Sequence, residues 1–66
     1  MGDIQAIAAA VRSARREAGL KQSDLADLAR VSERTVRAIE TGTGNPTLAA
    51  VVAVANVLGL RVITDG

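Results

Sequence analysis

The chain has 66 residues, a length that suits one small domain. It contains no cysteine, histidine or aromatic residue, which removes disulfides, the usual zinc and copper ligands, and the stacking platforms of single-stranded nucleic-acid binders. The net charge is only +1, but residues 12–37 hold seven of the eight basic side chains and four acidic ones, so this window carries +3 and the rest −2. Such a cluster fits either a solvated helix surface or a surface that faces a polyanion.

The sequence shows neither a membrane segment nor catalytic machinery. No apolar run approaches the roughly 20 residues that a membrane span needs, and the N-terminus lacks the layout of a signal peptide. There is no glycine-rich phosphate loop, and no base accompanies the serines. We therefore expect a cytoplasmic protein that is not an enzyme, makes no membrane contact and needs no metal or cofactor.

Residues 3–18 predict an amphipathic helix, because apolar side chains recur at intervals of three and four residues. The apolar stripe consists of Ile4, Ile7, Ala8, Val11, Ala14 and Ala18. Arg15 lies in the middle of this stripe, so its guanidinium must either extend to water or pair with a buried acid. Arg12 and Arg16 lie at the edge of the stripe and can stay in water. Gly19 is expected to end the helix.

Two short helices follow, with a three-residue break between them. The first, residues 22–29, begins after Lys21, a poor capping residue, so Ser23 or solvent must satisfy its first amides. It places four side chains for burial, namely Leu25, Ala26, Leu28 and Ala29. The second, residues 33–41, has Ser32 as a good N-terminal cap.

The helix expected over residues 33–41 has two different sides. Val36 and Ile39 share one side and can anchor the helix in a core. The opposite side carries Arg34, Arg37, Ala38 and Thr41. Gly42 is expected to end this helix.

Residues 42–46, GTGNP, predict a loop, and Thr47 caps a further helix that runs through Leu58. The principal apolar stripe of this helix consists of Leu48, Val51, Val52, Ala55 and Leu58. Its other side is also apolar and consists of Ala50, Ala53, Val54 and Val57. A helix that is apolar all round needs burial on two sides, and a chain this short covers only one, so we expect a second subunit.

Residues 60–64, LRVIT, alternate β-branched side chains and predict a short strand. A lone strand is unstable, and pairing with the same strand of a partner subunit would satisfy it. Residues 47–64 are therefore the expected dimerisation region. Its interface is expected to contain Ala50, Val54, Val57, Leu60 and Val62.

Residues 22–41 have the helix, tight break and helix of a helix-turn-helix motif, with the small Ala26 where the two helices must touch. Over about residues 4 to 60, with GLKQSDLADLARVSERTVRAIETG and GNPTLAAVVAVANVLGL as the matching stretches, the chain resembles the Cro/phage-repressor, or XRE, family. The matching positions are Gln22, Leu25, Ala26, Val31, Ser32, Ile39, Glu40, Gly42 and Pro46. Two positions depart from the family pattern. Arg30 replaces the usual turn glycine and must adopt a left-handed conformation or reshape the turn, and Lys21 replaces the usual Ser or Thr cap.

The resemblance implies one all-α, lambda-repressor-like domain of four to five helices over residues 1–66, with the C-terminal strand paired across a dimer. It implies a bacterial or phage homodimer that represses transcription by reading a palindromic operator in double-stranded DNA. The helix 33–41 would enter the major groove. The resemblance also implies a structural ion pair between Arg15 and Glu40.

The expected DNA-binding residues divide into base contacts and phosphate contacts. Three are matched to particular bases: Arg34 to guanine O6 and N7, Glu33 to cytosine N4, and Ala38 to the methyl group of thymine. Contacts to either base edges or backbone are expected from Ser32, Arg37 and Thr41. The resemblance implies that Gln22 and the amides of its helix N-terminus bind a phosphate, and Thr43, Gly44 and Asn45 would hold the neighbouring phosphates. Lys21 is also expected at the DNA surface, where it adds positive charge.

Two alternatives stay open at this point. The ending VLGLRVITDG is similar to that of HipB-like antitoxins, which bind a cognate toxin as well as their own operator. The other alternative is a protein-interaction module that keeps the fold without binding DNA, for which Arg30 and the modest net charge leave room. Binding that is insensitive to salt would favour the second, because phosphate contacts make DNA affinity fall steeply with ionic strength.

Overall fold

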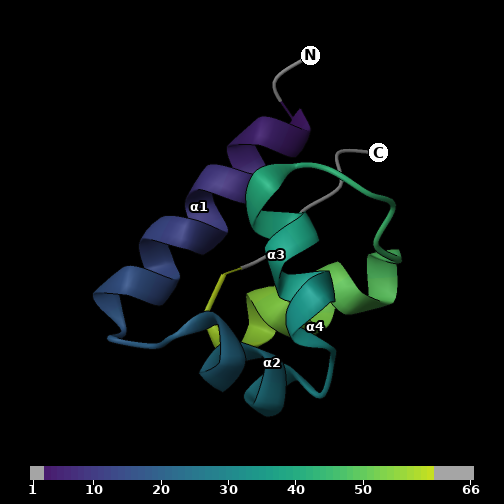
Figure 1. Cartoon of the computed structure of the whole chain (residues 1–66). Coiled ribbons are helices and arrows are strands. Elements are labelled where there is room, and N and C mark those ends of the chain that lie inside the picture. Colours follow the sequence, from purple (N-terminus) through teal and green to yellow (C-terminus); the bar gives the residue numbers. More distant parts are fainter. Residues whose placement is uncertain (1–2, 61–66) are drawn as a thin grey trace.

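The computed structural model describes residues 3–60 and builds them from four helices (Figure 1). These are α1 (Asp3–Glu17), α2 (Gln22–Ala29), α3 (Glu33–Thr41) and α4 (Leu48–Val57). In Figure 1, α3 occupies the centre, with α1 on one side, α4 on the other and α2 below. The predicted all-helical fold is thus confirmed for the described residues. The predicted strand lies outside them, apart from Leu60, which follows α4 in an irregular segment.

Side chains from all four helices meet in one hydrophobic core. Its buried members are Val11, Leu25, Ala26, Ala29, Val36, Ile39 and Val54. Val36 is fully buried and Ile39 is 4% exposed, which confirms the prediction that these two side chains anchor α3. Fully burying a side chain of this size contributes about 1.5–3 kcal/mol. Because α3 packs against each of the other three helices, its position is fixed from several sides.

Hydroxyl groups define where α3 and α4 begin. Ser32 Oγ accepts a hydrogen bond from the Thr35 N–H at 3.0 Å. Thr47 Oγ1 accepts one from the Ala50 N–H at 3.1 Å. Each cap is worth about 1 kcal/mol, and both were predicted from residue type.

The inward side of α4 is the predicted one at Val51, Ala55 and Leu58 and differs from the prediction at Leu48 and Val54. Val54 is fully buried in the chain's own core, so its assignment to a dimer interface is wrong. Leu48, predicted on the buried stripe, is 68% exposed. Every side of α4 is apolar, so no polar face reveals its rotation in the sequence. The side that packs inward follows Val51, Val54, Ala55 and Leu58, and Leu60 also packs against the core.

Three other large apolar side chains that were predicted to be buried are exposed, as is the smaller Ala18. Ile4 is 65% exposed, Ile7 38% and Leu28 59%. Ala8 and Val11 make the contact of α1 with the interior instead, because both are buried. Ile4 and Ile7 line an open groove whose other walls are Ala38, Ile39, residues 42–46 and Val51.

Arg30 ends α2 in the left-handed conformation, with φ 59° and ψ 42°. Among residues 3–60 it is the only residue other than glycine with a positive φ. A β-carbon in this conformation costs about 1–2 kcal/mol.

We predict that Arg30→Gly raises the free energy of unfolding by about 1 kcal/mol, because the extra freedom of glycine in the unfolded chain offsets part of the gain. Urea denaturation followed by circular dichroism measures the change.

The matched control for this prediction is Arg30→Ala. It removes the same charged side chain but keeps the β-carbon in the strained conformation, so it is expected to gain little stability. Equal gains in the glycine and alanine variants would assign the effect to loss of the arginine side chain and contradict the backbone explanation.

Gly42 ends α3 with φ 70°, and it also lies close to α1. A β-carbon placed here would lie 2.6 Å from Gln5 Nε2 and 3.2 Å from Ile4 Cγ2. We predict that Gly42→Ala lowers the free energy of unfolding by about 1–2 kcal/mol from backbone strain, plus a smaller loss from displacing the Gln5 amide. Thermal denaturation measures it.

Gly19→Ala separates these two effects. Gly19 has a similar φ of 73°, but a β-carbon there would meet nothing within 4 Å. Its substitution is therefore expected to show the strain alone. A loss in Gly42→Ala no larger than that in Gly19→Ala would exclude a steric contribution from α1.

Candidate nucleic-acid interface

Helices α2 and α3 pack against each other across a tight connection of residues 30–32. The connection turns back onto α2, where the Val31 N–H donates to the Ala26 carbonyl oxygen at 3.0 Å. Leu25 is fully buried and Ala26 is 3% exposed, so the two helices approach closely over a small side chain. This is the geometry of a helix-turn-helix, in which the first helix supports the second.

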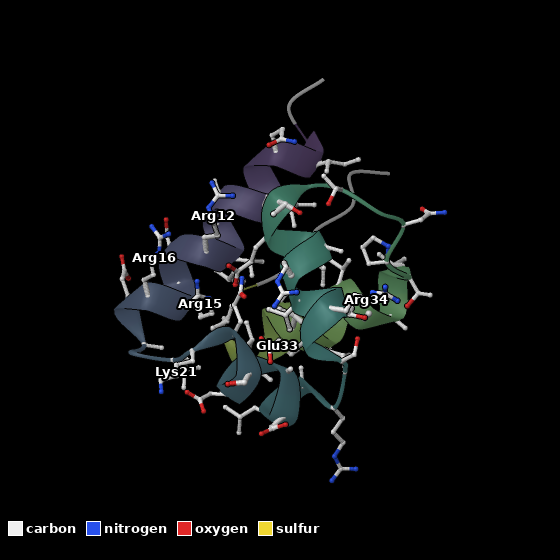
Figure 2. All side chains as sticks on the ribbon, viewed as in Figure 1. Arg12, Arg15, Arg16, Lys21, Glu33 and Arg34 are labelled. Atoms are coloured by element: carbon white, nitrogen blue, oxygen red, sulfur yellow. The ribbon has the colours of Figure 1, made fainter. Side chains whose placement is uncertain are left out.

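The side of α3 opposite to Val36 and Ile39 is open to solvent. Arg34, Arg37 and Thr41 are exposed there, and Ala38 is half-buried. Figure 2 shows Glu33 and Arg34 together in the first turn of α3. Within residues 3–60 the salt bridges engage Arg15 and Arg37, and Arg34 takes part in neither. Its guanidinium therefore keeps all its donors available for a ligand.

Arg37 differs from Arg34 because it already has an acidic partner. Its Nη2 lies 3.2 Å from Glu33 Oε2, one helical turn earlier. Both side chains are about half exposed, so the pair is worth only about 0.3–0.5 kcal/mol. A ligand can separate the two side chains at small cost.

The C-terminal end of α3 and the following loop present hydroxyl and amide groups. Thr41 Oγ1 donates to the Arg37 carbonyl oxygen at 2.9 Å and lies 2.6 Å from Thr43 Oγ1. Thr43, Gly44 and Asn45 are exposed. Both Thr41 and Thr43 are expected to bind DNA, and in the structure their hydroxyl groups are hydrogen-bonded to each other.

The N-terminus of α2 lacks a side-chain cap, as the lysine at that position predicted. Lys21 carries no acceptor, and Asp24 accepts the Lys21 backbone N–H at 2.9 Å, a contact that was not predicted. The first amides of α2 therefore stay available to an outside acceptor. Gln22 Nε2 points inward and donates to Glu40 Oε1 at 3.3 Å. This inward contact of Gln22 was not predicted.

Arg15 and Glu40 form a salt bridge between α1 and α3. Arg15 Nε lies 2.6 Å from Glu40 Oε2, and Arg15 Nη2 donates to Glu40 Oε1 at 3.1 Å. Arg15 Nη1 also donates to the Leu20 carbonyl oxygen at 2.9 Å. Glu40 is 1% exposed, so water cannot solvate its carboxylate. The guanidinium of Arg15 provides the compensating positive charge. Figure 2 shows Arg15 between α1 and α3.

The hydrogen bond to Glu40 raises the pKa of Arg15 above its ordinary value, against the opposing effect of burial. A basic group whose pKa is raised by folding contributes its full stabilisation at every pH below its pKa in the unfolded chain. This stabilisation is lost only as the pH rises through its pKa in the folded protein. For arginine this window lies far above neutrality, so the cation persists wherever the protein is handled.

Arg12 also contacts Glu40, which the sequence pattern did not reveal. Its Nη1 donates to the Glu40 backbone carbonyl oxygen, and the side chain is half-buried. The expectation that Arg12 stays in water is therefore wrong. Arg16 is exposed, as expected, on the flank of α1 turned away from α3 (Figure 2).

The described part of the chain contains neither a metal-binding cluster of acidic side chains nor a helix that could span a membrane. Among residues 3–60, no group of three or more acidic side chains is placed to hold a metal ion. No helix in the same range is long and apolar enough to cross a membrane. The exposed side of α3 and the surfaces next to it are thus the candidate site.

A comparison of the sequence with protein families matches residues 11–63 to a family described as helix-turn-helix. This match spans most of the chain and includes all of α2, α3 and α4. The chain belongs to the helix-turn-helix family of Cro/C1, or XRE, type, a class of DNA-binding regulators. A search of curated proteins finds no match.

Proposed function

We propose that the protein is a homodimeric repressor that reads a palindromic operator with α3 in the major groove. The single observation that carries the proposal is the exposed Arg34, which forms no salt bridge within residues 3–60, on a helix anchored by the buried Val36 and Ile39. A helix fits the major groove of B-DNA, and an arginine on it can bind guanine O6 and N7 with two hydrogen bonds.

The remaining side chains of α3 would extend this base reading. Thr41 and Ala38 lie on the same side as Arg34 and suit hydroxyl and methyl contacts to base edges. Glu33 would accept from cytosine N4, and Arg37 would contact a base or a phosphate once it leaves Glu33. Ser32 Oγ caps α3 by accepting the Thr35 N–H, and its exposed hydroxyl would be a further candidate for a contact to DNA.

Phosphate contacts would fix the orientation of the domain on the duplex. At one end, the uncapped amides of α2 and the exposed Lys21 offer donors and positive charge, which suit a phosphate at a helix N-terminus. Gln22 would add its amide after turning away from Glu40. At the other end, Thr43, Gly44 and Asn45 form an exposed loop that would hold the neighbouring phosphates.

A dimer is supported by the apolar surface that α4 leaves uncovered. Leu48 is 68% exposed and Val57 is 36% exposed, although both belong to a helix with scarcely any polar residue. Burial of such side chains in a second copy is favourable by about 25 cal/mol for each Å² of apolar surface. Of the predicted interface, Val57 and Ala50 stay in the proposal. Leu60 packs against the core of its own chain, and Val62 lies outside the described residues. Two copies of α3 would then meet successive major grooves about 34 Å apart.

Selection from a random-sequence duplex pool at moderate salt tests the proposal. The expected result is an enriched palindrome whose half-sites are centred about 10 base pairs apart. Sizing of the complex should give two chains on each duplex, and the logarithm of affinity should fall linearly with the logarithm of salt concentration.

Other results would support the alternatives. An enriched sequence without two-fold symmetry, bound by one chain, would overturn the dimer. No enrichment at all, together with salt-insensitive binding to a protein partner, would favour an interaction module. A neighbouring reading frame that encodes a co-purifying toxin would favour the antitoxin role and leave DNA binding in place.

A further inference from the structure

The C-terminal turn of α3 is held by a cation from another helix. The last carbonyl groups of a helix have no partner within it. The Thr43 N–H donates to the Ala38 carbonyl oxygen at 3.1 Å, and the Gly42 N–H donates to that of Ile39 at 3.3 Å. The next carbonyl, that of Glu40, accepts from Arg12 of α1. A guanidinium in this position satisfies the carbonyl and also stabilises the negative end of the helix dipole.

The same residue is held a second time through its side chain. Arg15, one turn after Arg12 on α1, binds the Glu40 carboxylate through Nε and Nη2. The carboxylate lies at the end of a rotatable side chain, so this contact alone lets the α3 backbone shift. The contact of Arg12 is with the backbone itself. Together the two arginines fix both the side chain and the main chain of Glu40 relative to α1.

We propose that Arg12 is a positioning residue for base reading. By holding the Glu40 carbonyl, it fixes the last turn of α3, and with it the depth and angle at which Thr41 and Arg37 meet the groove. The proposal rests on the proposed function, because it assumes that α3 reads bases. It assigns Arg12 no contact with DNA.

Three variants of the full chain test this role on the duplex selected above and on a random duplex, at several salt concentrations. Arg12→Met removes the donors and keeps most of the apolar stem, Arg12→Lys keeps a cation that can reach the carbonyl, and Arg16→Met is the matched control on the exposed flank.

Arg12→Met should weaken binding to the selected duplex by about tenfold, the size expected when one base contact is impaired. Affinity for the random duplex and the salt slope should stay as in the original chain. Arg12→Lys should recover most of the loss, and Arg16→Met should change neither affinity.

Three results would overturn the positioning role. A salt slope lowered by about 0.9 in Arg12→Met would identify Arg12 as a phosphate ligand. Equal losses on the selected and the random duplex would also exclude a role in base reading. Affinity unchanged in Arg12→Met would remove any role in binding.

A measurement without DNA keeps this inference separate from the proposed function. Gly42 and Thr43 follow α3, and their N–H groups donate to carbonyl groups of its last turn. Their amide hydrogen exchange should become several-fold faster in Arg12→Met and recover in Arg12→Lys. The Leu20 amide, which donates to the Arg15 carbonyl oxygen at the end of α1, should be unaffected. Equal acceleration at all three amides would mean general destabilisation and overturn the local role. If the original chain binds no duplex, the proposed function fails, and the exchange result still decides whether Arg12 positions α3.

Discussion

Replacing Arg15 with methionine is expected to lower the free energy of unfolding by about 3–5 kcal/mol, because it leaves the Glu40 carboxylate buried without its cation. Glu40→Leu is expected to cost a similar amount, since Arg15 is then the stranded charge. A single core of this size supplies roughly 3–5 kcal/mol in total, so both single variants should be largely unfolded at 25 °C. Far-ultraviolet circular dichroism and urea titration measure the loss.

The double variant Arg15→Met with Glu40→Leu is the decisive control. Two apolar side chains of similar volume can replace a buried ion pair at little cost, so the double variant should recover at least half of the lost stability. The Leu20 carbonyl and the half-buried Gln22 amide, which lose a partner, can bind water instead. A double variant as unstable as the single ones would show that the geometry of the pair, and not charge compensation, stabilises the fold.

Arg34→Met is expected to weaken binding to the selected operator by about 1–3 kcal/mol for each half-site, roughly 5- to 150-fold for each bound subunit. The cause is the loss of two hydrogen bonds to one guanine in each half-site. The preference for guanine at that position should disappear as well. Titration of the operator and of duplexes with the other three base pairs at that position measures both effects.

Arg34→Lys distinguishes base reading from charge. Lysine keeps the positive charge but lacks the planar pair of donors, so affinity for random DNA should persist while discrimination at one base pair falls. Full discrimination in the lysine variant would contradict a bidentate guanine contact. Neither variant should alter the unfolding transition by more than about 0.5 kcal/mol, because the side chain is exposed.

The helix boundaries were predictable because the chain marks them with specific residues. Ser32 and Thr47 can each accept a hydrogen bond from a backbone amide, and Gly42 tolerates a left-handed conformation at low cost. Val36 and Ile39 stand out on a helix that is otherwise polar, so its rotation was predictable too. Arg30 could adopt the left-handed conformation or reshape the turn, and only the structure distinguishes the two.

Other features depend on packing that a local pattern does not contain. The rotation of α4 is set by which side meets the other helices, and with an apolar residue on every side the sequence carries no signal for it. This is why Val54 was placed outside and Leu48 inside. The contacts of Arg12 and Gln22 with Glu40 join residues 28 and 18 positions apart, so they appear only when the helices come together. An arginine at the edge of an apolar stripe is the one hint that such a contact exists.

The exposed side of α3 and its buried side perform separate tasks. Val36 and Ile39 attach the helix to the rest of the molecule, whereas Arg34, Arg37 and Thr41 end in solvent. Changes at the outer positions therefore leave the scaffold nearly as stable as before. If α3 reads bases as proposed, the target sequence can be changed one side chain at a time, by natural variation or by engineering, without rebuilding the domain.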